Sequence, residues 1–316
     1  MVTIKTLNEA RIRLQNKLHV TPMLSSKTLD YDTNANIFIK SEHLQKTGSF
    51  KIRGATNRVT IAKNSGATNL LAASSGNHGQ AVAFIARELG LSATIIIPEN
   101  ANPAKEAAIR NYGSQIIHYG TTSKERIEHA QELQEQLNAV IIPPYDDVDV
   151  MAGQGTIGLE ILSQIHKPDI IVIPIGGGGL ISGIATAIKT INPEIKVIGV
   201  EPIEANGTYL SRKNGERVYI SASASIADGL RSATPGELTF PLIEKYVNDI
   251  VLVTEEEIRE AFTFYMSRMK QVVEPSGAVT LAALLAGKIP HEDNSKIVIV
   301  ASGGNVDTAE IAQFLT

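Results

Sequence analysis

Short runs of β-branched and other apolar residues alternate along the chain with longer segments of mixed polarity. The runs are apolar at consecutive positions, as in strands that helices cover on both faces of a sheet. The segments between them are long enough for helices, so the pattern predicts an α/β fold with open, parallel sheets, two in number. The predicted strands are residues 37–40, 70–73, 93–97, 115–118, 139–142, 170–175, 196–200 and 297–301.

The clearest amphipathic helix is predicted for residues 254–269. Thr254 and Glu257 have the spacing of a capping box, in which each residue bonds to the backbone of the other. An apolar stripe with helical spacing follows, and it indicates a helix with one buried face. The stripe consists of Ile258, Ala261, Phe262, Tyr265 and Met269.

Composition excludes several classes of function. The chain has 316 residues, no cysteine and a formal net charge of -4. Disulfides, zinc–thiolate sites and a thiol nucleophile are therefore excluded, and the lack of a basic stripe argues against nucleic acid and membrane surfaces as partners. The first 20 residues lack the apolar stretch of a signal peptide, and no apolar run approaches the length of a membrane span. We therefore expect a cytoplasmic protein with two domains or lobes.

A lysine lies at a predicted helix start in residues 46–55, KTGSFKIRGA. The helix is expected to begin near Ser49, which puts Lys51 in its first turn. Partial desolvation near a helix N-terminus disfavours the ammonium form, as a Schiff-base lysine requires. A solvated surface lysine is far commoner, and this motif alone leaves both readings open.

A polar loop follows the second predicted strand, in residues 74–80, SSGNHGQ. Small residues at a strand-to-helix turn leave backbone N–H groups free to hold an anion such as a substrate carboxylate. Ser74, Ser75 and Asn77 add side-chain donors. A capped helix start explains the same residues equally well, and His78 fits a packed structural histidine.

Four consecutive glycines, Gly176, Gly177, Gly178 and Gly179, lie between a predicted strand and an alanine-rich helix. Glycines at this place let the backbone surround a phosphate at the helix N-terminus. No Lys-Ser/Thr pair follows as in a Walker loop, and the dinucleotide fingerprint is absent. The position favours a phosphate site over a flexible linker.

The last predicted strand ends in Ser302, within residues 301–307, ASGGNVD. The hydroxyl of Ser302 would lie at the carboxyl edge of a sheet, where open α/β sheets bind ligands. Taken alone, this residue fits a simple turn. Together with an activated lysine, an anion loop and a phosphate loop, it completes the parts that a pyridoxal phosphate site needs.

Six motifs resemble those of the fold-type II pyridoxal-phosphate enzymes: KTGSFKIRGA, SSGNHGQA, GGGGL, IADGLRS, VVEPSGA and SGGNVD. They are most similar to those of the serine racemase and serine/threonine dehydratase (threonine ammonia-lyase) group, and the resemblance runs from about residue 21 to residue 307. It implies a two-lobed fold like that of the tryptophan synthase β chain, with open, twisted, mostly parallel sheets. Residues 1–68 and 147–316 would form the large cofactor-binding domain, and residues 69–146 a small mobile domain.

The resemblance implies a role for each motif toward pyridoxal 5'-phosphate. Lys51 would form the Schiff base and later act as the base for the substrate α-proton. The glycine loop would hold the phosphate, and Ser302 would face the ring nitrogen with a hydroxyl. The implied cofactor-binding residues are Phe50, Lys51, Asn77, Gly176, Gly177, Gly178, Gly179, Glu274 and Ser302.

The implied reaction is elimination of water and ammonia from L-serine and L-threonine, giving pyruvate or 2-oxobutanoate, with serine racemase activity beside it. Ser75 stands where serine racemases have a second acid/base on the opposite cofactor face, whereas threonine deaminases typically have alanine there. A proton donor on each face is what inversion of the α-carbon requires. The implied substrate-binding residues are Ser74, Ser75, Asn77, His78 and Gly229.

Three alternatives stay open. Serine racemisation as the main activity is the nearest, and 3-hydroxyaspartate dehydration is the second, with Arg231 as the cation to test. A non-catalytic, ligand-sensing relative is disfavoured because the lysine and the glycine loop are both intact.

A divalent cation is the other cofactor that the resemblance suggests. Serine racemases bind one at spacings that match Glu201, Ala205 and Gly207, and the glycine removes one carboxylate. A magnesium site is therefore expected to be weak or lost. The resemblance also implies a homodimer, and because the chain ends at Thr316 we expect no C-terminal regulatory domain.

Overall fold

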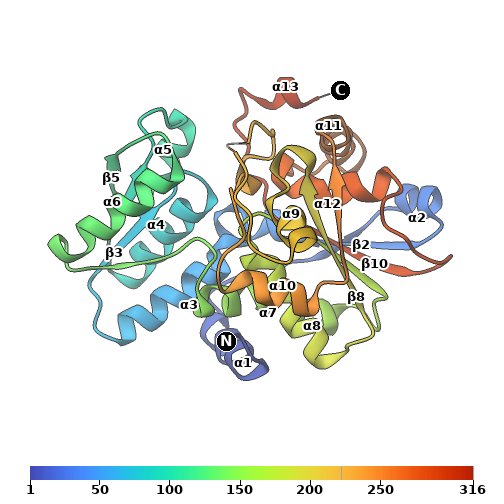
Figure 1. Ribbon diagram of the computed structural model, residues 1–316, viewed down its shortest axis with the longest axis horizontal. Coiled ribbons are helices and arrows are strands. Elements are labelled where there is room, and N and C mark those ends of the chain that lie inside the picture. The colour runs from blue at the N-terminus through green and yellow to red at the C-terminus, as the bar shows by residue number, and fades with distance from the viewer. Residues whose placement is uncertain (222, 316) are drawn as a thin grey trace.

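Two separate sheets divide the protein into a smaller and a larger lobe, which lie side by side in Figure 1. The computed structural model describes residues 1–221 and 223–315. Both sheets are built from parallel strands with helices on both faces, apart from one antiparallel edge strand. The predicted α/β fold with two sheets is confirmed.

The smaller lobe contains a four-stranded parallel sheet with the strand order β5-β4-β3-β6. Alternate residues of β3 point to opposite faces. Leu70 and Ala72 pack toward α3 and α4, and Leu71 packs toward α6. The elements of this lobe are β3 (Asn69–Ala73), α4 (Asn77–Leu89), β4 (Ser92–Ile97), α5 (Pro103–Asn111), β5 (Gln115–His118), α6 (Ser123–Gln136) and β6 (Ala139–Ile141).

The larger lobe contains a six-stranded sheet with the order β1-β2-β10-β7-β8-β9. Only β1 runs antiparallel to its neighbour. Since the other strands are parallel, their carboxyl ends share one edge of the sheet, where ligands of such folds bind. The strands are β1 (Met23–Ser25), β2 (Asn36–Ser41), β7 (Ile170–Pro174), β8 (Lys196–Pro202), β9 (Asp249–Val253) and β10 (Lys296–Ala301).

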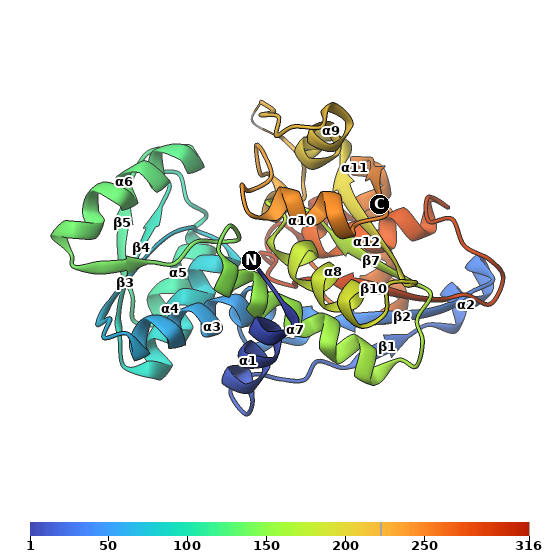
Figure 2. The ribbon, with the colours of Figure 1, turned by 60° about the horizontal axis from the view of Figure 1, so that its bottom comes forward.

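Helix α3 joins the two lobes. It packs against α4 of the smaller lobe and against α7 of the larger lobe, and Figure 2 shows it beside α7 between the two sheets. Residues at its start are therefore positioned where the lobes meet. The helices outside the smaller lobe are α1 (Ile4–Leu14), α2 (Lys27–Thr33), α3 (Lys51–Asn64), α7 (Val148–Gln164), α8 (Gly179–Ile191), α9 (Gly207–Asn214), α10 (Thr239–Tyr246), α11 (Glu255–Phe264), α12 (Pro275–Leu285) and α13 (Ile311–Phe314).

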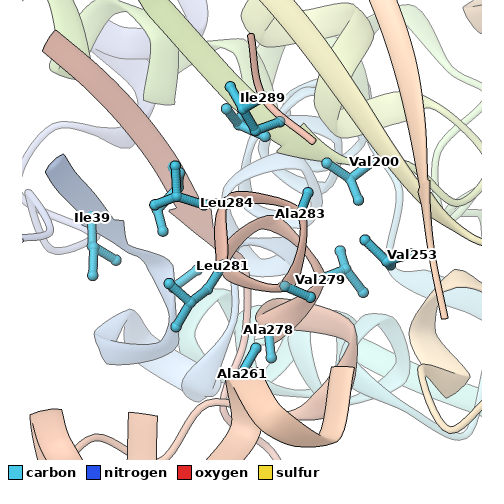
Figure 3. Close-up of a cluster of buried hydrophobic side chains, with 14 of the residues drawn as sticks. Ile39, Val200, Val253, Ala261, Ala278, Val279, Leu281, Ala283, Leu284 and Ile289 are labelled. Carbon is cyan, nitrogen blue, oxygen red and sulfur yellow. The ribbon is translucent and has the colours of Figure 1, made fainter. Parts of the chain in front are cut away.

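The core of the larger lobe centres on α12, whose small and branched side chains are buried around its circumference (Figure 3). Val279 lies toward Val200 and Val253 of the sheet, and Ala278 lies toward Ala261 of α11. A helix that is apolar on every side is stable only when other elements cover it completely. Helix α12 is thus an internal support on which Glu274, the residue preceding it, is held.

The predicted elements agree with the structure except in three places. All eight predicted strands are present, but the edge strands β1 and β9 were not predicted. The capping box at Thr254 and Glu257 is confirmed, with bonds of 2.8 and 3.2 Å between each side chain and the backbone N–H of the other residue. The helix after it ends at Phe264, and one π-helical turn, Tyr265–Met269, takes its place.

The division into domains at residues 68/69 and 146/147 stays a prediction. Every strand of the four-stranded sheet lies between these positions. The mobility of this lobe stays a prediction as well. Within the described ranges, no helix combines the length and the apolarity that a membrane span requires.

Candidate active site

Lys51 is the first residue of α3 and is half-buried. Its Nζ donates a hydrogen bond of 2.8 Å to the carbonyl oxygen of Pro144, and the ring centroid of Phe50 is 5.2 Å away. Burial lowers the pKa of the Lys51 ammonium to about 8, although the negative charge of Glu274 opposes the shift. A lysine whose neutral form is populated near neutral pH is suited to act as a nucleophile or base.

The backbone before α3 pairs with the end of β10. Ser49 forms a bridge with Gly303, and Phe50 N–H donates to the carbonyl oxygen of Ser302 at 3.0 Å. This pairing brings the first and last motifs of the sequence together, so Lys51 and the buried Ser302 flank the same place. The strand-end position expected for Ser302 is therefore confirmed, and its side chain has 3% exposure.

Asn77 and Glu274 lie in contact across the lobe boundary. Asn77 Nδ2 donates to Glu274 Oε1 at 2.7 Å, and Asn305 Nδ2 donates to Asn77 Oδ1 at 2.7 Å. Burial raises the pKa of the Glu274 carboxyl to about 8, and the nearby Asp228 adds to the shift. Glu274 is therefore mostly protonated at neutral pH. Asn305 was not identified from the sequence, although it lies in the SGGNVD motif.

The four glycines form a tight loop between β7 and α8. Gly178 has a φ of 93°, which a residue with a side chain rarely adopts. A Cβ atom added to Gly176 would lie 3.2 Å from the Cα of Leu230, and one added to Gly178 would lie 2.8 Å from Thr239 Oγ1. Because no side chain fits at these positions, the loop leaves backbone N–H groups at the N-terminus of α8, the arrangement that binds phosphate.

The residues of the SSGNH motif lead into α4. The helix begins at Asn77 after Gly76, and no side chain caps its N-terminus. The structure thus lacks the side-chain cap that would explain these residues as a simple helix start. Ser74 and Ser75 are half-buried. His78 is buried, its Nε2 lies 2.8 Å from the carbonyl oxygen of Ile142, and burial lowers its pKa to about 3, so its ring is neutral at physiological pH.

The loop that contains Gly229 packs against both the glycine loop and α12. Gly229 N–H donates to Ser276 Oγ at 2.9 Å, and its carbonyl oxygen would lie 3.3 Å from a Cβ added to Gly176. Asp228 pairs with Lys105 of α5, which lies in the smaller lobe. Sequence reasoning missed this ion pair because its partners are remote along the chain.

Arg231 bonds to the backbone of a nearby loop. Its side chain is exposed, and its Nε donates to the carbonyl oxygen of Ser225 at 2.6 Å. The cation proposed for a second substrate carboxylate is therefore engaged by backbone outside the glycine loop.

Glu201 does not fit a cation site. It is buried at the end of β8, and its two carboxylate oxygens accept N–H bonds of 3.0 and 2.7 Å from Thr208 and Tyr209. Both oxygens thus satisfy the first turn of α9, where a hard cation would need them together with several other oxygens. Over residues 1–221 and 223–315, no group of three or more histidine or acidic side chains has the arrangement of a metal site. The sequence already made a magnesium site at Glu201, Ala205 and Gly207 doubtful, and these contacts give it no support.

Comparison with known proteins agrees with this arrangement. Residues 14–303 match the family described as "Pyridoxal-phosphate dependent enzyme". An L-threonine ammonia-lyase of Thermotoga maritima is 42% identical over 316 residues, covering 100% of this chain and 78% of that protein. The structure of maize serine racemase matches with a TM-score of 0.94 and 38% identity, covering 99% of this chain and 96% of that one. The structure of a threonine deaminase from T.th. matches with a TM-score of 0.91 and 41% identity, over 96% of this chain and 99% of that one.

Proposed function

The chain belongs to the family of pyridoxal-phosphate dependent enzymes, and we propose that it eliminates the β-hydroxyl of L-serine and L-threonine as water. Hydrolysis of the dehydrated product then takes up one water and releases ammonia. The observation that carries the proposal is Lys51, which has a pKa of about 8. It lies at the start of α3, the helix that packs against both lobes. The relatives named above act on threonine or serine by their names. The products would be pyruvate from serine and 2-oxobutanoate from threonine.

The residues present fit the cofactor. At each of the four glycines an added Cβ atom would lie within 3.2 Å of a neighbouring residue. The loop can therefore keep this backbone only with glycine, and its backbone N–H groups at the start of α8 suit a phosphate. We assign Phe50 to the face of the ring, Asn77 with Glu274 to the phenolic oxygen, and Ser302 to the ring nitrogen. When bound, pyridoxal phosphate supplies an electron sink for negative charge that develops at the substrate α-carbon.

The protein side chains would then divide the remaining work. Lys51, with its lowered pKa, takes the α-proton at its Nζ. The loop of Ser74, Ser75, Asn77 and His78 holds the substrate carboxylate with its N–H and hydroxyl donors, and Gly229 closes the substrate site. A hydroxyl at Ser302 instead of a carboxylate supplies no negative charge that would stabilise a protonated ring nitrogen, so the nitrogen would stay unprotonated. The electron sink would then be weaker, which favours loss of the β-hydroxyl over transamination.

Serine racemisation is a second candidate, which Ser75 favours. It provides a hydroxyl in the loop opposite the lysine lobe, and the maize serine racemase has a TM-score of 0.94 to this chain. Inversion needs one proton donor on each face of the α-carbon. Ser75→Ala is therefore expected to spare elimination and abolish racemisation.

A product assay with the holoenzyme tests both candidates. L-serine, L-threonine and L-threo-3-hydroxyaspartate are supplied separately, and pyruvate, 2-oxobutanoate, oxaloacetate and D-serine are quantified with and without magnesium. We expect keto acids from serine and threonine, with no dependence on magnesium. Absence of any keto acid would refute the elimination reaction, and equal loss of both activities in Ser75→Ala would assign Ser75 to binding alone.

The assembly and the location belong to the same proposal. We propose a cytoplasmic homodimer with a mobile small domain of residues 69–146. Light scattering of the purified protein measures the dimer directly, and a monomer at micromolar concentration would contradict it. Hydrogen exchange with and without L-serine tests the mobile domain, because closure on a substrate would slow exchange at the lobe boundary.

A further inference from the structure

Residues 143–147 lead from the smaller lobe back to the larger one. Three of them bond to Lys51, to the segment before α10 and to α7. The carbonyl oxygen of Pro144 accepts the bond from Lys51. Asp146 accepts backbone N–H bonds of 2.9 Å from both Glu237 and Leu238, at the start of α10. The carboxylate of Asp147 caps α7 with bonds of 2.8 and 2.9 Å. Tyr145 is held between these anchors.

Tyr145 lies directly against the glycine loop. A Cβ atom added to Gly177 would lie 2.4 Å from each of three ring atoms, Cε1, Cε2 and Cζ. Equal distances to atoms on both sides of the ring mean that Gly177 faces the flat surface of the ring. A Cβ added to Gly179 would lie 2.8 Å from the Cβ of the same tyrosine. Tyr145 therefore occupies the space that side chains at two loop positions would take.

The loop has a second support besides the ring. The carbonyl oxygen of Gly177 accepts bonds of 2.8 Å from Thr239 Oγ1 and 3.2 Å from Gly236 N–H. Gly177 is thus held both by the ring and by these two donors. Glycine loses more conformational freedom on ordering than any other residue, so a glycine loop without such supports would bind an anion weakly.

We propose that Tyr145 is a cofactor-positioning residue, whose ring holds Gly177 and Gly179 in the conformation that binds the cofactor phosphate. The proposal rests on the proposed function only in its assignment of the phosphate to the glycine loop. It gives Tyr145 a role through the backbone of the loop, and no role in proton transfer. Burial raises the pKa of the Tyr145 phenol, which keeps the hydroxyl neutral and agrees with a packing role.

Cofactor affinity tests the proposal without turnover. Equilibrium dialysis of holoenzyme gives the Kd of pyridoxal phosphate and, after exchange, that of pyridoxal, which lacks the phosphate. We expect Tyr145→Ala to weaken pyridoxal phosphate binding about tenfold or more and to leave pyridoxal binding within about threefold. Tyr145→Phe keeps the ring and is expected to match the wild type, and Tyr145→Leu, which keeps bulk without a flat ring, to lie between. Equal weakening of both ligands would show a general structural role and overturn the proposal.

Exchange of size between the two residues is a sharper test. Gly177→Ala places a methyl group 2.4 Å from the ring atoms, so we expect it to reduce pyridoxal phosphate binding strongly. The double variant Tyr145→Ala with Gly177→Ala removes that clash and is expected to regain about tenfold in affinity over Gly177→Ala alone. A double variant no better than Gly177→Ala would contradict the proposed contact.

Gly178→Ala is the matched control. Its added Cβ would meet Thr239 at 2.8 Å, and its φ is 93°, so removal of the Tyr145 ring cannot relieve it. We expect Tyr145→Ala to give no recovery in this background, and a recovery there would overturn the specific pairing. If the enzyme fails to convert serine or threonine while these affinities change as expected, the substrate assignment is wrong and the role of Tyr145 stands.

Discussion

The first turn of α3 carries two cations, Arg53 and Lys51, whose surroundings are opposite. The Arg53 side of the helix is called the rear and the Lys51 side the front. Behind the helix, Arg53 is 2% exposed and donates to Glu42 at 2.7 and 2.8 Å and to Glu160 at 2.6 and 2.9 Å. In front of it, the ammonium of Lys51 donates to a neutral acceptor, the Pro144 carbonyl oxygen. The helix thus places a cation held by two carboxylates two residues from a cation held by a carbonyl group.

The pKa values of these cations move in opposite directions for that reason. Burial disfavours both charges, but the carboxylates of Glu42 and Glu160 outweigh burial at Arg53 and raise its pKa. At Lys51 the opposing charge is Glu274, whose own pKa is raised to about 8, so burial prevails. The ion pairs of Arg53 with Glu42 and Glu160 hold the helix in place, whereas the Lys51 ammonium loses its proton easily. The comparison predicts that function and stability separate between the two sides.

The largest expected effect on activity is at Lys51. Lys51→Ala removes the base, and we expect turnover of L-serine to fall by at least about 10³-fold. Stability of the cofactor-free protein should stay equal or rise, because a buried ammonium with little pairing is costly to fold. Urea unfolding and a pyruvate assay measure the two quantities.

Lys63→Ala, at the exposed end of the same helix, is the control. It removes one exposed bond from Lys63 Nζ to the Leu89 carbonyl oxygen, so it should leave turnover unchanged and cost at most about 1 kcal/mol of stability. Appreciable residual turnover in Lys51→Ala would refute the assigned role, and a large loss of stability would show that the front is as firmly built as the rear.

The next effect is on the rear network, and here stability should respond. Arg53→Met leaves Glu42, with 0% exposure, and Glu160 without their guanidinium. Removing one partner of a buried ion pair typically costs about 3–5 kcal/mol. Urea unfolding of the cofactor-bound protein measures it. Arg53→Lys keeps the charge but cannot make the four bonds, so its stability should lie between those of the wild type and Arg53→Met. A cost of Arg53→Met below about 1 kcal/mol would mean that the network does not stabilise the fold.

The sequence predicted candidates at the front of α3, but not the ion pairs at its rear or the supporting residues Tyr145 and Asn305. Lys51, Ser302 and the glycine loop follow strand ends or begin helices, so local pattern and motif were enough to select them as candidates. Lys40 lies near the end of β2 and Glu42 follows that strand. Both look like solvated charges, because their burial depends on α3 and α7, which are distant in the sequence. Tyr145 and Asn305 act through equally distant contacts. Local pattern carries no information about such partners.

The two edge strands were missed for different reasons. β1 has three residues, too few to show a run of strand residues. β9 does contain an apolar run, residues 250–253 after Asp249, so the sequence allowed this prediction and it was not made. The π-helical turn after Phe264 was also not predicted, since the apolar stripe continues through it at helical spacing.

A smaller effect is expected in the pH dependence of the front. Glu274 has a pKa of about 8, so it is protonated below that pH and becomes charged above it. A new negative charge beside the site disfavours negative charge at the substrate α-carbon. We expect kcat/KM of the wild type to fall above pH 8, by about tenfold at one unit above the pKa, whereas Glu274→Gln stays active there. An alkaline limb shared by both proteins would assign it to another group.

The smallest effect is expected where the two lobes touch in front of the site. Lys105 and Asp228 are bonded across the lobe boundary with side-chain exposures of 24% and 42%, so water and salt screen the pair. Lys105→Ala should therefore cost at most about 1 kcal/mol of stability, in contrast to Arg53→Met. Any effect should appear in KM for L-serine and diminish in high salt, because the pair links α5 to the loop before Gly229.

The charge-reversed double variant, Lys105→Asp with Asp228→Lys, separates pairing from mere position. If the pair acts by attraction, the double variant restores the low-salt KM that either single change raises, and Glu135→Gln, an exposed change elsewhere in the smaller lobe, leaves KM as it was. If Lys105→Ala lowered the free energy of unfolding as much as Arg53→Met, the two sides of α3 would not differ in stability. The front would then be held as firmly as the rear. A weak, salt-sensitive pair is what the proposed mobility of residues 69–146 requires, because this domain would have to separate from the loop at Asp228 while α3 stays fixed.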